Sequence, residues 1–416
     1  MLKFKDKSFL SSFTTLTTGS IIAQAVALGC APILTRLFTP EEIGAYAYLI
    51  SFAAIFMGVI NGKYDMAIVV ENEKRKAYAL LKLSFLIGGL LTLLGTLIFV
   101  GYSILLKNHF RWTDVLFILI VLLSYAIIDA LTAYNNRKRE YKVMASVNVI
   151  RSSCQNVGAA LLGLFPIGKA GLLIPYVCGQ YLGIIQQGKT LKEDWREIAS
   201  IPNSEMKEVL VKYRRQPIYS APAALANSFS YSSITIFLKT LFGDALVGFY
   251  SISVRLLGLP LALISGNASK VFFESAAVEY NNTGSFRSAF KKVALFQIAL
   301  AVPMVLVMYY FAPPVCEFVF GSAWRVAGDY IRILAPMFGI RFVVTTLTPA
   351  MIIVNKQRLE LVLQLMFVLS SIVCFILCRL FGYGIETYLR IINLFFSAVY
   401  LIYFGIIFSL SRKVRK

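Results

Sequence analysis

Arginine side chains interrupt some of the long apolar stretches of this sequence. Arg255 lies within the segment 245–266, and Arg332 and Arg341 lie within the segment 327–354. A guanidinium group is planar, always charged, and matches the oxygens of phosphate and carboxylate groups. At the centre of a membrane helix an arginine costs about 2.5–3.5 kcal/mol on insertion scales, and it rarely occurs there without a role in a cavity. These arginines therefore predict a binding site for an anionic ligand.

The spacing of two of these arginines leaves two interpretations open. Arg332 precedes Arg341 by nine residues, and nine steps of about 100° place them on opposite faces of one helix. Both can line one cavity only if the helix bends, and Pro336 lies between them. Otherwise Arg332 extends toward the outer lipid headgroups.

The first half of the chain contributes charges of both signs. Lys63 and Asp65 follow an apolar run that ends at Gly62, and Asp129 lies near the end of a later run. Interfacial anchoring accounts for Lys63, and pairing with a neighbouring helix accounts for Asp129. A role in a cavity is the alternative for Lys63 and Asp65.

The sequence predicts no catalytic group and no metal site. His109 is the only histidine, and the six cysteines contain no C-x-x-C pair. The segment 163–170 resembles a phosphate-binding loop, but Ala170 stands where that loop has Ser or Thr and no strand precedes it. A tight turn between two helices is the better interpretation.

The elements that must position these residues are predicted to be membrane helices. The chain has 416 residues, of which 58% are hydrophobic and 15% charged, whereas about a quarter of the residues in soluble domains are charged. Twelve apolar runs, counting the two that arginine interrupts, are long enough to cross a bilayer as helices. The predicted fold is an all-α integral membrane protein with about twelve transmembrane helices.

The basic residues predict the orientation of these helices. They occur in short clusters between the apolar runs and give a formal net charge of +20. With both termini in the cytoplasm, 29 of the 41 Lys and Arg residues lie on the cytoplasmic side and 7 on the other. This asymmetry is typical of basic cytoplasmic loops and not of a nucleic-acid-binding patch, so no nucleic-acid partner is expected.

One long connection divides the chain into two halves. Residues 189–216 form a predicted cytoplasmic linker with two short interfacial helices. They separate an N-lobe of six spans, residues 1–188, from a C-lobe of six spans, residues 217–416. Two six-helix lobes predict a duplicated architecture with a central cavity between the lobes.

Blocks of residues along most of the chain resemble one known family. They include Leu34-Thr-Arg-Leu-Phe-Thr-Pro40-Glu-Glu-Ile-Gly44, Gly62-Lys-Tyr-Asp65-Met-Ala-Ile-Val69, Leu241-Phe-Gly243, Val247-Gly-Phe-Tyr250 and Leu259-Pro260-Leu261. In these blocks and their spacing the chain resembles the Wzx-type O-antigen flippases, the polysaccharide-biosynthesis exporters of the multidrug/oligosaccharidyl-lipid/polysaccharide (MOP) superfamily.

The resemblance implies two six-helix lobes of the MATE type around a cationic cavity that works by alternating access. It also implies a cargo, an undecaprenyl-pyrophosphate-linked O-antigen or related repeat unit. This cargo would move from the cytoplasmic to the periplasmic leaflet of a bacterial inner membrane. Both termini would be cytoplasmic, and the protein would be a transporter and not an enzyme.

Position and resemblance together give the predicted site residues. Arginine would hold phosphate or an acidic sugar, and Tyr64 could stack on a sugar face. The candidates for substrate binding are Arg255, Arg341, Arg332, Lys63, Tyr64 and Asp65, and the candidates for gating or coupling are Asp129 and Arg36.

Three alternatives remain open on the sequence. A MATE-like drug or cation antiporter would have acidic residues in its cavity, where only Asp65 and Asp129 qualify. A polysaccharide polymerase or ligase would need a catalytic outer region, but the outer connections are short. A lipid II flippase usually has two more spans.

The expected partners follow from the same interpretation. They are the lipid-linked oligosaccharide, membrane lipids, and polymerase or chain-length proteins of the same pathway. No cofactor is expected, although transport can be coupled to a proton or sodium gradient. The sugar, the coupling ion and the oligomeric state are not predicted.

Overall fold

Helices make up nearly all of the described backbone. The computed structural model describes residues 7–105, 111–354 and 356–412, and no strand occurs in these ranges. The predicted all-α fold class is confirmed. Its physical basis is that an apolar segment in lipid must satisfy its backbone hydrogen bonds internally, which a helix does.

Among the described residues, eight helical segments are long and apolar enough to cross a membrane. Four other long helices correspond to predicted spans, and the total of about twelve stays a prediction. They are α2 (Pro40–Met57), α6 (Tyr141–Leu162), α7 (Ala170–Gly188) and α10 (Ala221–Phe242). The eight segments are Thr17–Leu37, Lys74–Leu105, Trp112–Arg137, Asp244–Thr283, Arg287–Phe320, Ser322–Ile353, Arg358–Phe381 and Ile385–Ser411.

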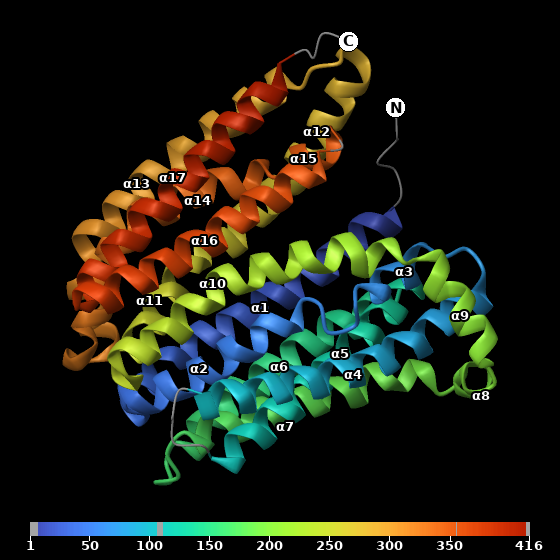
Figure 1. The fold of residues 1–416 in the computed structure, drawn as a ribbon, viewed down its shortest axis with the longest axis horizontal. Coiled ribbons are helices and arrows are strands. Elements are labelled where there is room, and N and C mark those ends of the chain that lie inside the picture. Colours follow the sequence, from blue (N-terminus) through green and yellow to red (C-terminus); the bar gives the residue numbers. More distant parts are fainter. Residues whose placement is uncertain (1–6, 106–110, 355, 413–416) are drawn as a thin grey trace. The chain divides into compact units, whose positions relative to one another are not determined.

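The chain divides into two compact units. Unit 1 comprises Met1–Thr39 and Leu49–Ser228. In it α1 packs along α6, α6 along α7, and α4 along α5. Figure 1 labels these helices. The elements are α1 (Lys7–Leu37), α3 (Tyr64–Val70), α4 (Lys74–Leu105), α5 (Trp112–Arg137), α6 (Tyr141–Leu162), α7 (Ala170–Gly188), η1 (Lys189–Leu191), α8 (Trp195–Ala199), α9 (Asn203–Lys212) and the π-helical turn η2 (Gln216–Ser220).

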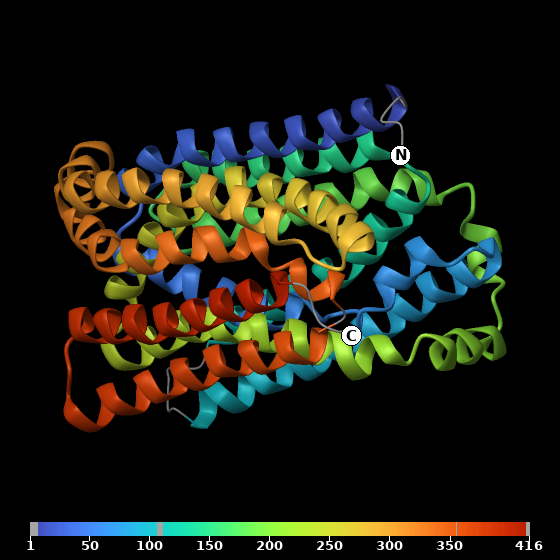
Figure 2. The same cartoon turned by 90° about the horizontal axis from the view of Figure 1, so that it is seen from above.

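Unit 2 comprises Pro40–Tyr48 and Phe229–Lys416. Figure 2 shows α13, α14 and α17 side by side in this unit, where α14 also packs against α11. The elements are α11 (Asp244–Pro260), the π-helical turn η3 (Leu261–Ser265), α12 (Gly266–Thr283), α13 (Arg287–Phe320), η4 (Ser322–Trp324), α14 (Arg325–Leu347), α15 (Ala350–Ile353), α16 (Gln357–Phe381) and α17 (Ile385–Ser411). Two helices, α2 (Pro40–Met57) and α10 (Ala221–Phe242), contribute residues to both units.

Each unit is organised around one central helix. The most apolar stretch of α5 is 50% buried in protein, and that of the segment containing α14 is 56% buried, the two highest values among the eight candidate spans of the described chain. Such a helix offers positions at which a polar side chain can contact protein and not lipid. Asp129 lies on α5 and Arg341 on α14.

The compact units differ in their bounds from the lobes expected at 1–188 and 217–416. The linker residues 189–216 belong to unit 1, which extends to Ser228, and Pro40–Tyr48 belongs to unit 2. The linker belongs to unit 1 because its carboxylates form ion pairs with Lys74, Arg75 and Lys138 of α4 and α5.

Candidate substrate-binding site

Arg341 is enclosed by aromatic side chains in unit 2. The centre of its guanidinium lies 4.1 Å from the ring centroid of Tyr231 on α10 and 5.3 Å from that of Phe338 on α14. A cation over an aromatic face is attracted by the ring quadrupole, and more strongly where water is excluded. These contacts hold the guanidinium in place without neutralising it.

A second layer of aromatic residues fixes the Tyr231 ring. Phe396 packs edge-on against Tyr231 with ring centroids 5.9 Å apart, and Phe367 lies 6.3 Å away. The Tyr231 hydroxyl forms a hydrogen bond with the hydroxyl of Tyr400, which is 2% exposed. These contacts restrict the Tyr231 ring, which can serve as a platform for Arg341.

Arg341 has no carboxylate partner within the described part of the chain. Its Nε is buried without a hydrogen-bond acceptor, and Tyr250 of α11 is among the tyrosines near its guanidinium. A buried donor without an acceptor is costly, and five guanidinium donors suit phosphate or carboxylate oxygens. The arrangement can bind an anion that enters from outside the protein.

Arg332 lies against a different neighbour from Arg341. Its Nε donates to the carbonyl oxygen of Tyr309 on α13 at 3.0 Å, and its side chain is 43% exposed. The helix α14 continues through Pro336, and Asn393 accepts a hydrogen bond from the backbone N–H of Met337 at 3.0 Å. The two arginines contact different helices, as their nine-residue spacing predicts for one helix. The structure does not bring them together.

Arg255 is half-buried on α11, five residues before Pro260. The helix changes there to the π-helical turn η3, whose buried Ser265 donates to the carbonyl oxygen of Phe342 at 3.0 Å. Single π-helical turns are frequent at functional sites. The residue that α11 brings to Arg341 is Tyr250, and a substrate contact of Arg255 stays a prediction.

In unit 1 a strained turn positions the Lys63 block. Gly62 and Lys63 both have positive φ, 57° and 64°, a conformation that costs little for glycine and more for lysine. The buried Asn61 holds the turn by donating to the carbonyl oxygen of Ala126 on α5 at 3.0 Å. Gly88 makes room for Asn61, since a Cβ there would lie 2.5 Å from the Asn61 Oδ1.

The charged residues predicted in unit 1 are brought together around Asp129. Lys63 and Asp65, at the start of α3, both act electrostatically on the Asp129 carboxyl group. So does Arg151 from α6, which was not among the predicted site residues. Two carboxylates and two cations therefore share one region of unit 1, formed by α3, α5 and α6.

Arg151 is held much as Arg341 is. Its guanidinium lies 5.3 Å from the ring centroid of Tyr125 and donates to the Tyr125 hydroxyl at 3.2 Å. Gly183 provides the space, because a Cβ there would lie 2.9 Å from the Arg151 Cδ. The four-residue spacing of Gly179 and Gly183 predicts helix packing, but no sequence signal connects these glycines with Arg151.

Tyr64 and Arg36 are the remaining predicted site residues, and each has surroundings of its own. Tyr64 is 3% exposed, and its hydroxyl donates to the carbonyl oxygen of Leu210 in α9 at 3.2 Å. This burial leaves no open ring face for a sugar, so in this structure Tyr64 supports the linker. Arg36 is exposed in the last turn of α1, where a cation complements the helix dipole.

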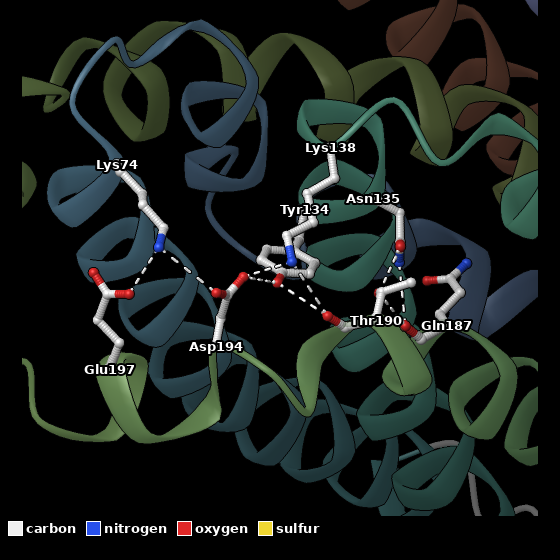
Figure 3. Close-up of polar contacts among 8 residues, drawn as sticks. All are labelled: Lys74, Tyr134, Asn135, Lys138, Gln187, Thr190, Asp194 and Glu197. Carbon is white, nitrogen blue, oxygen red and sulfur yellow. Dashed lines mark hydrogen bonds and ion pairs between the residues drawn. The ribbon is translucent and has the colours of Figure 1, made fainter.

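The linker is bound to unit 1 by a network of charges (Figure 3). Asp194 pairs with Lys138 at 2.6 Å and accepts a hydrogen bond from the Tyr134 hydroxyl at 2.6 Å. Lys74 pairs with Glu197 at 2.8 Å. These contacts join the ends of α4 and α5 to the linker.

A second carboxylate in this region is almost completely buried. Glu71 is 4% exposed, and it accepts hydrogen bonds from Lys212 Nζ at 2.5 Å and from the Tyr213 hydroxyl at 3.0 Å. Burial acts to raise the pKa of Glu71, but these donors and the backbone N–H of Glu73 outweigh it and lower the pKa to about 2. Burial also acts to raise the pKa of Asp194, but the hydrogen bonds from Lys138 and Tyr134 outweigh this effect. The pKa of Asp194 is therefore lowered as well.

These pKa values predict that acid loosens the linker. A carboxylate with a depressed folded-state pKa stabilises the docked state above its ordinary value of 4.5, and this stability disappears as the pH falls toward about 2. A spin label at Lys207→Cys on α9, in a Cys178→Ser background, should become more mobile between these limits. A label at Arg379→Cys on α16 is the control and should not respond. Equal mobility at pH 7 and pH 3 would contradict the prediction.

Among the described residues, no group of three His, Cys, Asp or Glu side chains could hold a metal ion. The residues around Arg341 and those around Asp129 can interact with a ligand through charged groups and aromatic rings.

The fold is shared with solved transporters. A mutant of the Vibrio cholerae MATE transporter VcmN has a TM-score of 0.59 and 13% identity, and the match covers 97% of this chain and 96% of that chain. A MOP superfamily transporter from Pyrococcus furiosus has a TM-score of 0.60 and 15% identity over 96% of both chains. An outward-facing multidrug resistance MATE family transporter has a TM-score of 0.61 and 14% identity, over 96% of this chain and 94% of that chain.

Identities this low show the fold alone. The predicted MATE-like fold class is confirmed, and the chain is a multi-pass membrane protein with the fold of these transporters. A search of curated proteins gives no match.

A family model identifies the chain more closely. The model described as polysaccharide biosynthesis protein matches residues 33–329. The matched segment contains the Lys63 block, Asp129, Arg151 and Arg255, and it ends before Arg341. The resemblance predicted from the sequence blocks is confirmed at this level: the chain belongs to the polysaccharide biosynthesis protein family.

Proposed function

We propose that this protein moves an anionic amphiphile between membrane leaflets, namely an undecaprenyl-pyrophosphate-linked oligosaccharide such as an O-antigen repeat unit. The observation that carries the proposal is Arg341, whose charge lies on the most buried candidate span of the described chain and is enclosed by aromatic rings without a carboxylate. A pyrophosphate supplies the acceptor oxygens that this guanidinium lacks. The family description supports a cargo of polysaccharide synthesis.

The same chemistry suggests how the cargo is handled. The polyprenyl tail stays in the lipid while the pyrophosphate and the sugars pass through protein by alternating access. Arg341 and Arg255 in unit 2 contact phosphate or acidic sugar, and the Lys63 and Asp65 region of unit 1 contributes to the path. Asp129 and Arg36 are the candidates for gating or for coupling to a proton or sodium gradient.

A drug or cation antiporter of the same fold is the alternative. It would bind its cargo through carboxylates, and in unit 1 the carboxylates of Asp65 and Asp129 are accompanied by Lys63 and Arg151. The Pyrococcus furiosus relative is described as having a binding pocket of reverse polarity that suggests a different function. Members of this superfamily can thus differ in the polarity of the site, and the Arg341 cluster favours an anionic cargo here.

The direction of transport depends on how the chain is oriented in the membrane. The excess of basic residues supports a cytoplasmic location for both termini and for the linker. Transport then runs from the cytoplasmic to the periplasmic leaflet of the inner membrane, toward the polymerase and chain-length proteins that would use the unit.

The test is the location of the lipid-linked unit in a strain that lacks this protein. Assembly of the unit would continue, so single undecaprenyl-linked units should accumulate and stay protected in spheroplasts from an added lectin or glycosidase. Surface polymer should be absent. If the accumulated units were instead fully accessible from outside, they would already have crossed the membrane, and the polymerase or ligase alternative would replace transport. Complementation with the wild-type gene is the control.

A further inference from the structure

The acidic and the basic side chains of the linker lie in different environments. Residues 189–215 contain seven Lys and Arg residues and five Asp and Glu residues. Four of the five carboxylates pair with basic residues of α4 or with Lys138, which directly follows α5. These pairs are Asp194 with Lys138, Glu197 with Lys74, Glu205 with Arg75 and Glu208 with Lys76.

The basic residues of the linker have a different environment. Among the described residues, no ion pair engages five of the seven linker bases, and all five are exposed. They are Lys192, Arg196, Lys207, Arg214 and Arg215. Of the other two, Lys212 pairs with Glu71 and Lys189 donates to Gln186. Glu193 is the only exposed linker carboxylate without a pair in the described part of the chain. The linker therefore turns its negative charge toward unit 1 and leaves a net positive charge on the outside.

The linker is also anchored at the depth where a membrane span begins. Lys82 on α4 donates to the carbonyl oxygens of Ala199 at 3.2 Å and Ile201 at 2.7 Å. The long uncharged run of α4 starts at the next residue, Leu83. Figure 1 shows α8 and α9 at this end of unit 1. We therefore expect a segment held beside Lys82 to lie at the level of the lipid headgroups.

Apolar residues of the linker support this depth. Trp195, next to Arg196, is 55% exposed, and Val211, near Arg214, is 58% exposed. Tryptophan is enriched at the boundary between lipid and water, where its ring is apolar and its N–H is solvated. Short helices with exposed basic and apolar residues bind anionic membrane surfaces.

We propose that the exposed bases of the linker, together with Trp195, bind the headgroups of anionic phospholipids at the membrane surface beside α4. The site is distinct from the arginine clusters within the spans, and it does not depend on the identity of the cargo. The pairing of the linker carboxylates with α4 and α5 is what makes the site cationic, because it removes the negative charges that would repel a phosphodiester.

The test uses the full chain in nanodiscs and the fluorescence of Trp195. Lipids brominated on their acyl chains quench tryptophan on contact, and the difference between the wild type and Trp195→Phe isolates the signal of Trp195. Brominated phosphatidylglycerol in a phosphatidylcholine background should quench this signal at a lower mole fraction than brominated phosphatidylcholine. The double variant Lys192→Gln, Arg196→Gln should need more phosphatidylglycerol, by about fivefold for each basic residue that contacts a headgroup.

The matched control is Arg379→Gln, an exposed arginine in the last turn of α16. It removes the same charge from another place and should leave the quenching unchanged. The double variant should unfold at the wild-type temperature, because neither residue has a partner in the described part of the protein. Equal quenching by the two lipids, no quenching by either, or an effect of Arg379→Gln as large as that of the double variant would each overturn the proposal.

Discussion

Replacement of Arg341 by alanine is expected to abolish transport while the protein remains in the membrane at its normal level. The variant removes a guanidinium that Tyr231 and Phe338 hold without a carboxylate partner in the described chain. Loss of one partner of a buried charge pair costs about 2–5 kcal/mol, so transport should fall roughly 30-fold or more. Arg341→Lys should restore only part of the activity, since an ammonium cannot bind two oxygens in a fork. Surface polysaccharide in a complemented deletion strain is the measurement.

The matched control for this prediction lies on the same helix. Arg332→Ala removes an arginine that binds the Tyr309 carbonyl and is 43% exposed, so its effect should be much milder. Tyr231→Phe keeps the ring under Arg341 and should retain more activity than Tyr231→Leu, which removes it. Wild-type polysaccharide in the Arg341→Ala strain would rule out the cationic mechanism. Equal loss in the Arg332 and Arg341 variants would show that position on α14 is irrelevant.

Gly44→Ala is expected to destabilise the protein severely. A Cβ at Gly44 would lie 1.8 Å from the carbonyl oxygen of Asp244, and one at Gly248 would lie 2.0 Å from that of Pro40. Backbone atoms stand in the way at both positions, so the start of α2 and the start of α11 would have to separate. Overpacking usually costs 1–3 kcal/mol, and contacts this short should cost about 3 kcal/mol or more. Gly248→Ala should have the same effect.

The measurement is the thermal unfolding temperature of the purified variants in detergent, with the yield of monodisperse protein. Gly29→Ala and Gly405→Ala are the controls, since no atom outside their own helix turns lies within 4 Å of a Cβ at either position. Both controls should be neutral or slightly stabilising, because alanine favours a helix over glycine. A Gly44→Ala protein that unfolds at the control temperature would show that the two helices are not as close as described.

Composition and charge were sufficient to predict the membrane helices and to single out Arg341. Long apolar runs can only be buried in lipid, and an arginine within one is costly enough to indicate a role. The surroundings of Arg341 could not be predicted, because Tyr231, Phe338, Phe367 and Tyr400 come from four different helices. Phe338 lies three residues before Arg341 on the same helix, but only the packing of the four helices brings the other three rings to it, and no spacing in the sequence encodes that packing.

In unit 1 the surroundings of Arg151 and Tyr64 could not be predicted from the sequence. Arg151 precedes an apolar run by one residue, so it looks like an ordinary charged boundary, and only the structure shows it against Tyr125 and Gly183. Tyr64 is the opposite case. It lies in a block that resembles a transporter motif, yet its burial and its bond to Leu210 give it a supporting role in this structure.

The assignment of Pro40–Tyr48 to unit 2 bears on how the gene could be divided. A fragment that ends at the linker would carry the first half of α2 without Gly248 and Asp244, the backbone against which Gly44 is fitted. Its complement would expose the vacated surface of α11. Two such fragments could fold only if they were made together and exchanged this segment, as subunits do in a domain-swapped dimer. We therefore expect that neither half of the chain folds without the other, although a linker joins them.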